Sequence, residues 1–235
     1  MIARASIFFF LCHPAGAETV SVKEISYAEV AETIPLVLDF ERPAQVLGGL
    51  LVYPGLAIGE RFAGQSLMAR QDDMLVWHEV LEDSSPDAPL TALPAPAPGD
   101  LVFRHEGHWN SVALHGVGPG GVPGTGTLAL SFDPPVCYLA FRSAIDGMSR
   151  FGEVNNTILR GKPEGSLNLR FFDVEGRLLA NFMRSYNPEG PIAVGYIQSG
   201  QAEAMIAGVL LQNLDLGGVA IDDLRFDPLC PYKLF

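Results

Sequence analysis

Hydrophobic residues recur along this chain in short runs, and turn-forming residues separate the runs. In residues 166–171, polar and apolar side chains alternate, as they do in a strand with one buried and one solvated face. Asp173-Val174-Glu175-Gly176 follows, and Gly176 suits the left-handed position of a bulged hairpin turn. The pattern therefore predicts an antiparallel hairpin over residues 166–184.

Similar runs predict strands along the rest of the sequence. They cover residues 36–40, 51–53, 74–81, 101–104, 111–115, 127–132, 136–142, 166–172, 177–184, 192–198, 205–212 and 219–226. Helical patterns are few: residues 26–33 could form two turns. Residues 202–210 are ambiguous, but Gly208 and the β-branched Ile206 and Val209 favour a strand. We therefore expect an all-β fold, a two-sheet antiparallel jelly-roll sandwich.

Composition agrees with one β-sandwich domain over residues 18–235. The 235-residue chain is 18% charged and contains 25 Gly and 18 Pro, which is typical of many short strands joined by turns. Residues 82–100 hold five prolines among Ala, Ser and Asp, so we expect an exposed surface loop with polyproline character. Too few strands precede this loop to form a separate sandwich.

Residues 1–17 are typical of a secretion signal. Arg4 precedes an apolar run at residues 5–11, and Ala15-Gly16-Ala17 supplies the small residues that signal peptidase prefers. A buried N-terminal strand is the alternative interpretation. No later run approaches the ~20 apolar residues of a membrane helix, so we expect a secreted or periplasmic protein without membrane insertion.

The net charge of -12 argues against nucleic acid as a partner, because phosphate binding requires clustered Lys and Arg. It argues equally against anionic membrane surfaces. Outside the predicted signal the sequence has two cysteines, Cys137 and Cys230. In an exported protein such a pair suggests one disulfide, which would fasten the C-terminal tail to the sandwich; two buried free thiols are the alternative.

Carboxylates interrupt the first and the last strand-like runs. Asp39 and Glu41 lie in the first, and Asp222 and Asp223 lie in the last. Terminal strands of a sandwich often pair, so these acids could converge on a Ca²⁺ ion, which prefers six to eight oxygen ligands. The alternative is that the acids face solvent at strand ends, with Arg42 and Arg225 as ion-pair partners.

Patterns for other chemistry are weak. The glycine-rich run at residues 116–121 lacks the helix that a dinucleotide site requires. His105, His108 and His115 do not have the spacing of a zinc protease motif. Glu79 and Glu82 are three residues apart and would face opposite ways on a strand, which does not suit the carboxylate pair of a glycosidase.

The acidic end motifs resemble those of known families. Asp39-Phe40-Glu41 and the run Ile221-Asp222-Asp223-Leu224 resemble the first and last strands of jelly-roll carbohydrate-binding modules and of MAM domains of animal cell-surface proteins. In those families a Glu of the first motif and an Asp of the last commonly ligate a structural cation. The resemblance therefore implies Glu41 and Asp222 as ligands, with Asp223 as a further candidate.

A larger part of the chain, residues 36–226, resembles exported proteobacterial proteins of unknown function, including ones that have a PEP-CTERM sorting tail. The similar segments are residues 59–65, 126–133, 171–176, 206–209 and 218–226. The sorting tail itself is not found here, so this resemblance implies an exported sandwich without implying its attachment.

We expect a non-catalytic binding module whose ligand is a glycan. Sugars stack on exposed aromatic rings, and the candidate platforms are Trp77, Trp109, Tyr138, Tyr186 and Tyr196. One alternative is a structural or interaction protein of the cell surface or extracellular matrix, with another extracellular protein as its partner. A second alternative is a polysaccharide hydrolase or lyase.

Overall fold

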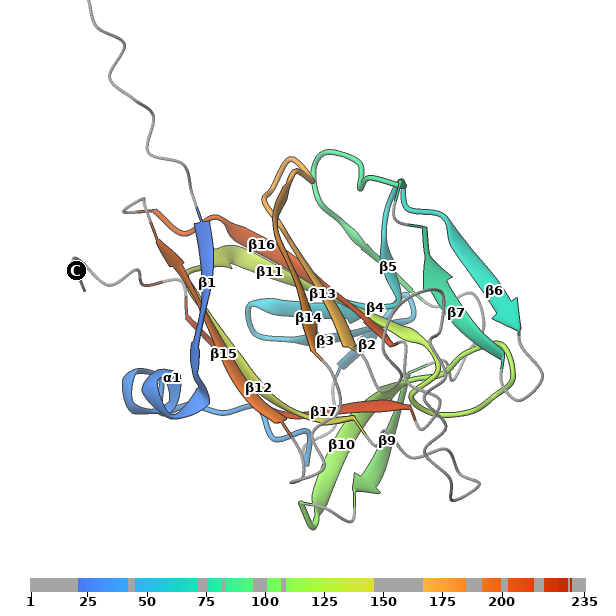
Figure 1. Cartoon of the computed structure of the whole chain (residues 1–235), viewed down its shortest axis with the longest axis horizontal. Coiled ribbons are helices and arrows are strands. Elements are labelled where there is room, and N and C mark those ends of the chain that lie inside the picture. The colour runs from blue at the N-terminus through green and yellow to red at the C-terminus, as the bar shows by residue number, and fades with distance from the viewer. Residues whose placement is uncertain are drawn as a thin grey trace, which may run out of the picture.

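The computed structural model describes residues 21–41, 45–71, 76–81, 83–94, 101–106, 109–145, 167–184, 192–199, 203–213, 218–227 and 229. These residues form an all-β sandwich of two antiparallel sheets with one short helix (Figure 1). The all-β prediction is confirmed, and the jelly-roll winding stays a prediction. The described residues contain no helix that is both long enough and apolar enough to span a membrane.

The two sheets hold six and seven strands. In order across the sheet, the six-stranded one contains β1 (Ser21–Ser26), β15 (Ile192–Ser199), β12 (Tyr138–Ile145), β17 (Val219–Asp227), β10 (Ser111–Gly116) and β9 (Leu101–Glu106). The seven-stranded sheet contains β14 (Leu178–Arg184), β13 (Leu167–Phe172), β16 (Ile206–Asn213), β11 (Thr127–Val136), β4 (Leu56–Gly59), β3 (Leu50–Tyr53) and β2 (Gln45–Leu47).

Two further strand pairs lie beside the main sheets. They are β5 (Arg61–Phe62) with β8 (Ala92–Leu93), and β6 (Leu67–Gln71) with β7 (Val76–Val80). The helix is α1 (Tyr27–Thr33), which agrees with the prediction for residues 26–33. Ser26 and Glu29 begin it with a capping box, in which each side chain accepts a hydrogen bond from the other residue's backbone N–H.

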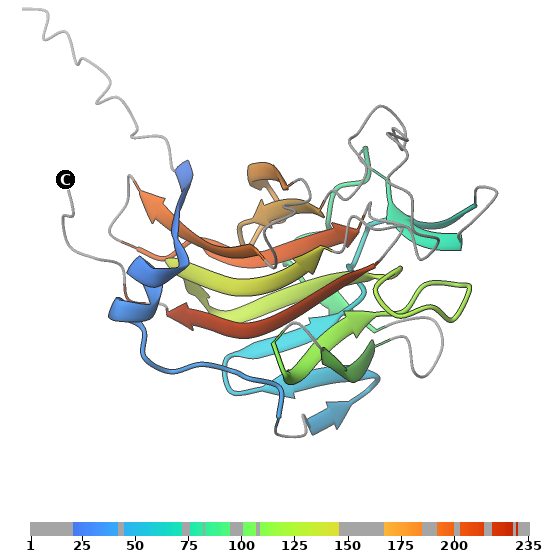
Figure 2. The same cartoon turned by 60° about the horizontal axis from the view of Figure 1, so that its bottom comes forward.

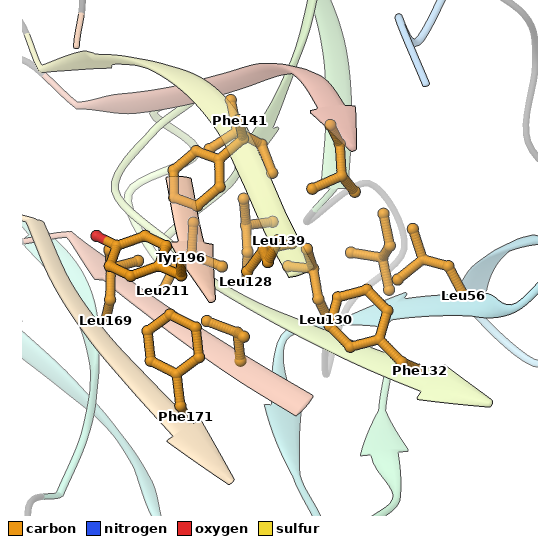
Figure 3. Close-up of a cluster of buried hydrophobic side chains, with 14 of the residues drawn as sticks. Leu56, Leu128, Leu130, Phe132, Leu139, Phe141, Leu169, Phe171, Tyr196 and Leu211 are labelled. Atoms are coloured by element: carbon orange, nitrogen blue, oxygen red, sulfur yellow. The ribbon is translucent and has the colours of Figure 1, made fainter. Parts of the chain in front are cut away.

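Side chains from the inner faces of both sheets form the main core (Figure 3). The ring of Tyr196 on β15 is completely buried, and its centroid lies 4.8 Å from that of Phe171 and 5.0 Å from that of Phe182. Leu139 and Phe141 of β12 enter the core from the same sheet as Tyr196. This packing of large apolar side chains between the sheets is the main stabilising contribution.

Each sheet also has an outer face that is partly covered. Helix α1 packs Val30 and Ile34 against Tyr138 and Ile197 on the six-stranded sheet. Figure 1 shows α1 beside β12 and β15. Tyr27, the first residue of α1, also reaches β17, where its hydroxyl donates to the backbone carbonyl of Asp223 at 3.2 Å.

Residues 83–94 of the predicted Pro-rich loop pack more closely than expected. Pro86 and Ala92 are buried, and Ala92 joins Phe62 and Phe172 in an apolar cluster on the outer face of the seven-stranded sheet. The backbone N–H of Leu90 donates to the carbonyl of Val174 at 2.7 Å. Much of this segment is exposed, as predicted for a surface loop, but apolar residues between the prolines contact the sheet.

The predicted hairpin is present as β13 and β14, and Gly176 has a φ of 74° in its turn. A register shift between Phe171 and Phe172 supplies the bulge. Residues 36–40, in contrast, do not form a regular strand. Leu38 makes one isolated bridge to Leu224.

Truncation of a core ring tests this packing. We expect Phe171→Ala to lower the free energy of unfolding by about 3–5 kcal/mol, because the cavity lies between two sheets that cannot collapse around it. Phe171→Leu keeps most of the volume and should cost clearly less. Chemical denaturation measures both. Equal losses for the two variants would contradict a tightly packed site.

Candidate functional site

The two ends of the described chain meet on the last strand. The backbone N–H of Leu38 donates to the carbonyl of Leu224 at 2.8 Å, and the N–H of Leu224 donates to the carbonyl of Leu38 at 3.0 Å. On the same strand β17, Ile221 pairs with Leu114 of β10. The segment at Leu38 and strand β10 therefore lie along successive parts of β17, and Figure 2 shows the blue segment after α1 running towards the green strands. The predicted proximity of the ends is confirmed.

A bulge in β17 marks the place where its partners change. Asp223 has a φ of 51°, and the register with β12 shifts between Ala140 and Arg142. Phe40, in the opposing segment, has a φ of 55°. Left-handed backbone at residues other than glycine costs on the order of 1–3 kcal/mol, so surrounding contacts must maintain it. Burial of the Phe40 ring against Tyr53 and Phe103 supplies such contacts.

Two of the predicted acids converge on the start of β10. The Glu41 Oε1 atom accepts a hydrogen bond from the backbone N–H of Val112 at 2.8 Å. The Asp222 Oδ2 atom accepts one from the Ser111 hydroxyl at 2.5 Å. Because Ser111 and Val112 are consecutive, the carboxylates of Glu41 and Asp222 are anchored to neighbouring residues. We call this group, Glu41, Ser111, Val112 and Asp222, the terminal junction.

The Asp222 carboxylate is incompletely satisfied. Asp222 is 1% exposed, and its buried Oδ1 atom has no hydrogen-bond partner in the described part of the chain. Burial raises the pKa of Asp222 above its ordinary value, while the hydrogen bond from Ser111 acts in the opposite direction. A buried carboxylate oxygen without a donor is costly, and a bound cation would relieve that cost.

The terminal junction fits a hard cation only with help from neutral oxygens. Across the described ranges, no group of three or more His, Cys, Asp or Glu side chains could hold a metal. A calcium ion here would use Glu41 and Asp222 and take its other ligands from backbone carbonyls or water, which is common for Ca²⁺.

The other two predicted acids have different partners. The Asp39 Oδ1 atom accepts a hydrogen bond from the N–H of Glu41 at 3.2 Å, so Asp39 shapes the turn that leads to Glu41. The Asp223 Oδ2 atom lies 2.8 Å from Arg142 Nε in an ion pair. Asp39 and Asp223 thus each have a partner within the chain, and their role as metal ligands stays a prediction.

The alternative interpretation made Arg225 an ion-pair partner of these acids, but the structure gives it other partners. Its Nε donates to the Tyr27 hydroxyl at 2.9 Å, and its Nη1 donates to the carbonyl of Ile34 at 2.6 Å. The Tyr27 hydroxyl donates in turn to the carbonyl of Asp223 at 3.2 Å. Arg225 thus ties α1 and the segment after it to the bulge in β17. Arg42 lies outside the described residues.

Most of the predicted sugar platforms are core residues. Tyr196, Tyr138 and Trp77 are 0%, 3% and 6% exposed. Their rings cannot stack on a sugar, so these assignments are wrong. Tyr196 is buried between the two main sheets, Tyr138 packs beneath α1, and Trp77 is buried on β7 of the separate β6–β7 pair. Tyr186 lies outside the described residues.

Trp109 is the exception among the described candidates. It precedes β10 and is only partly buried, and it packs against Ala113 of β10 and Ala220 of β17. Leu114 and Ile221, the neighbours of these alanines in sequence, point into the core. Trp109 therefore lies on the outer face of the six-stranded sheet.

Two further buried acids, Glu79 and Glu60, contact basic side chains. Glu79, a candidate acid for glycoside hydrolysis, pairs with Arg70 at 3.0 Å. Glu60 contacts the His78 ring where β7 meets the seven-stranded sheet. Glu82 lies outside the described residues, so the predicted relation between Glu79 and Glu82 stays untested.

Of the two cysteines in the predicted disulfide, only Cys137 lies among the described residues. Cys137 is completely buried between β11 and β12. Cys230 lies outside the described residues, as does the predicted signal at residues 1–17. The pairing of Cys137 with Cys230 and the export of the chain stay predictions.

Comparison of the chain with protein-family models, with curated proteins and with solved structures gives no match.

The sequence did not single out His115 as a buried histidine on the sheet. Burial lowers its pKa from 6.5 to about 4, and the charge of Arg104 acts in the same direction. His115 is 8% exposed, and its Nε2 atom has no hydrogen-bond partner among the described residues. The folded protein therefore holds this imidazole neutral.

This lowered pKa predicts a loss of stability in acid. Between pH 6.5 and about 4 the unfolded chain binds a proton at His115 that the folded chain does not, so stability falls as the pH is lowered through this range. We expect the wild-type protein to lose up to about 3 kcal/mol more than His115→Gln between pH 7 and pH 4. Urea denaturation at several pH values measures the difference. Parallel pH profiles for the two proteins would contradict it.

Proposed function

We propose that this chain is an exported, non-catalytic β-sandwich module that binds a glycan, and that a calcium ion at the terminal junction joins its two ends. One observation supports the proposal most directly. Glu41 and Asp222, from opposite ends of the sequence, are anchored side by side on Ser111 and Val112, and the Asp222 Oδ1 atom is buried without a partner among the described residues.

The role assigned to calcium is structural. When bound, the ion would supply positive charge to the two carboxylates that are hydrogen-bonded to Ser111 and Val112. Two residues with left-handed backbone adjoin the junction: Phe40 precedes Glu41, and Asp223, at the bulge of β17, follows Asp222. A cation there would stabilise both against the unfolded chain, since ligands that bind only the folded state add to its stability.

Glycan binding is supported by one partly exposed aromatic ring. Trp109 presents its indole on the outer face of a sheet, where a flat ligand could stack on it. The buried acids Glu79 and Asp173 are engaged in ion pairs with Arg70 and Arg177, which favours binding over catalysis. Secretion through residues 1–17 and a Cys137–Cys230 disulfide belong to the same proposal.

A second candidate is an interaction protein that uses a sheet edge. Strand β2 is the edge of the seven-stranded sheet, and Val46 and Leu47 on it are 65% and 51% exposed. An exposed apolar edge strand can pair with a strand of another chain. This edge favours the interaction protein over the hydrolase or lyase as the alternative.

Calcium should stabilise the wild-type protein through Asp222. We expect calcium at about one hundred times its Kd to raise the Tm by about 5–10 °C over protein in chelator. Asp222→Asn should abolish this shift. In chelator it should melt at or above the wild-type Tm, because the amide avoids burial of an unpaired charge. Differential scanning calorimetry measures all four states.

The control is Asp173→Asn. Asp173 is as buried as Asp222, but it accepts hydrogen bonds from Glu175 N–H and Arg177 N–H in a distant turn. This variant should melt lower in both buffers and keep the full calcium shift. A wild-type Tm that is the same with and without calcium would reject the structural ion.

Glycan binding is tested by screening the purified mature protein on an array of bacterial, plant and animal oligosaccharides. The proposal predicts saturable binding that calorimetry reproduces in solution. An absence of binding to the whole array, together with self-association in size-exclusion chromatography, would favour the edge-strand alternative instead.

A further inference from the structure

One outer face of the sandwich brings polar and aromatic side chains together around Trp109. In the strand register, Ala113 of β10 pairs with Arg104 of β9, and Arg142 of β12 pairs with Asp222 of β17. Because Leu114 pairs with Ile221, Ala113 lies beside Asp222. Arg104, Ala113, Asp222 and Arg142 therefore form one row across four adjacent strands.

All members of this row belong to the outer face. Leu114 and Ile221 belong to the core, so the residues next to them in sequence point the opposite way. Adjacent strands lie about 4.8 Å apart, so three strand spacings place the backbones of Arg104 and Arg142 about 14 Å from each other. This span suits an oligosaccharide better than a single sugar.

Trp109 lies over the middle of the row. Its indole packs against the methyl groups of Ala113 and Ala220, which are 0% and 2% exposed. The two alanines are diagonal neighbours on β10 and β17, and their small side chains leave room for the indole above them. The indole is partly exposed, so part of its surface stays accessible, and a sugar can stack on an accessible aromatic ring.

Hydrogen-bonding groups flank the ring on both sides. Arg104 is exposed, has no ion pair with any residue that the structure describes, and lies close enough to His115 to lower its pKa. On the other side, the Arg142 side chain is 43% exposed and forms an ion pair through its Nε with Asp223. The Arg142 Cζ atom lies 5.9 Å from the centre of the Tyr27 ring.

We propose that a neutral oligosaccharide binds across this row, with one sugar ring stacked on Trp109 and hydroxyl groups hydrogen-bonded to Arg104 on one side and to Arg142 and Asp223 on the other. The inference rests on the proposed glycan-binding function and gives it a place and a ligand class.

The charges of this face and of the whole chain favour a neutral ligand. The two arginines are matched by Asp222 in the row and by Asp223 next to it, so this face has no excess of positive charge, and Asp223 supplies the more accessible acceptor. The whole chain has a net charge of -12, which repels polyuronates and sulfated glycans. A hydroxyl-rich neutral sugar uses guanidinium donors and carboxylate acceptors equally well.

The test uses the full mature chain and defined probes. Cellohexaose, xylohexaose, mannohexaose and an oligogalacturonate are titrated by calorimetry into wild type, Trp109→Ala, Trp109→Phe, Arg104→Ala and Arg142→Ala. The matched control is Arg61→Ala, on β5 of a different sheet. Melting temperatures establish that each variant is folded.

We expect at least one neutral hexasaccharide to bind and the acidic one not to bind. Trp109→Ala should weaken binding about tenfold or more, which corresponds to about 1.4 kcal/mol. Trp109→Phe should recover part of that loss because it keeps a ring. Each of the two arginine variants should weaken binding several-fold, and Arg61→Ala should leave it unchanged.

A readout on the wild-type protein avoids any dependence on folding of the variants. In NMR titrations, the indole N–H signal of Trp109 should shift on addition of the bound sugar, and that of the core residue Trp77 should stay in place.

The possible negative results separate failure of this site from failure of the glycan-binding function. Neutral-glycan binding that is unaffected by Trp109→Ala, with no shift of the Trp109 signal, would overturn this site and leave the glycan-binding function standing. Preference for oligogalacturonate would overturn the neutral ligand class. Binding to none of the probes here and to nothing on the broader array would overturn both the site and the proposed function.

Discussion

The pairing of Leu38 with Leu224 is the interaction on which the rest of the structure depends. Strand β17 is central in its sheet, and β10 accompanies only part of it. The segment at Leu38 takes over where β10 begins, so a residue near the start of the described chain completes the hydrogen bonding of the last strand. Without that segment, the second half of β17 would present unpaired backbone groups on one side.

The terminal junction also contains backbone conformations and a buried charge that destabilise the folded state, so other contacts there must compensate for them. Phe40 and Asp223 both have left-handed backbone, and Asp222 is a desolvated carboxylate. Aromatic packing of Phe40 and the hydrogen bond from Ser111 compensate in part. A cation would compensate the remaining charge. Strain and unpaired charge of this kind gather at functional sites, where a ligand contributes to stability.

Sequence reasoning was most successful where a pattern is local. Alternation in residues 166–171 and the glycine of the following turn predicted β13 and β14, because strand period and turn chemistry do not depend on distant residues. It also predicted that the two acidic ends would meet. It failed for Tyr196, since the burial of its ring is decided by the opposite sheet, and for Trp77, which is buried on the separate β6–β7 pair. Arg104 and Arg142 were missed because only strand register makes them flank Trp109.

The outer face and the terminal junction share strand β17, since Asp222 belongs to both. Loss of the junction would therefore disturb the proposed sugar site as well as the fold. The most direct test of this account is a crystal structure of the protein grown with calcium, with anomalous scattering data. We predict an anomalous peak bonded to Asp222 Oδ1 and to the Glu41 carboxylate. A structure in which Glu41 and Asp222 lie far apart, or in which no ion binds between them, would contradict the central claim.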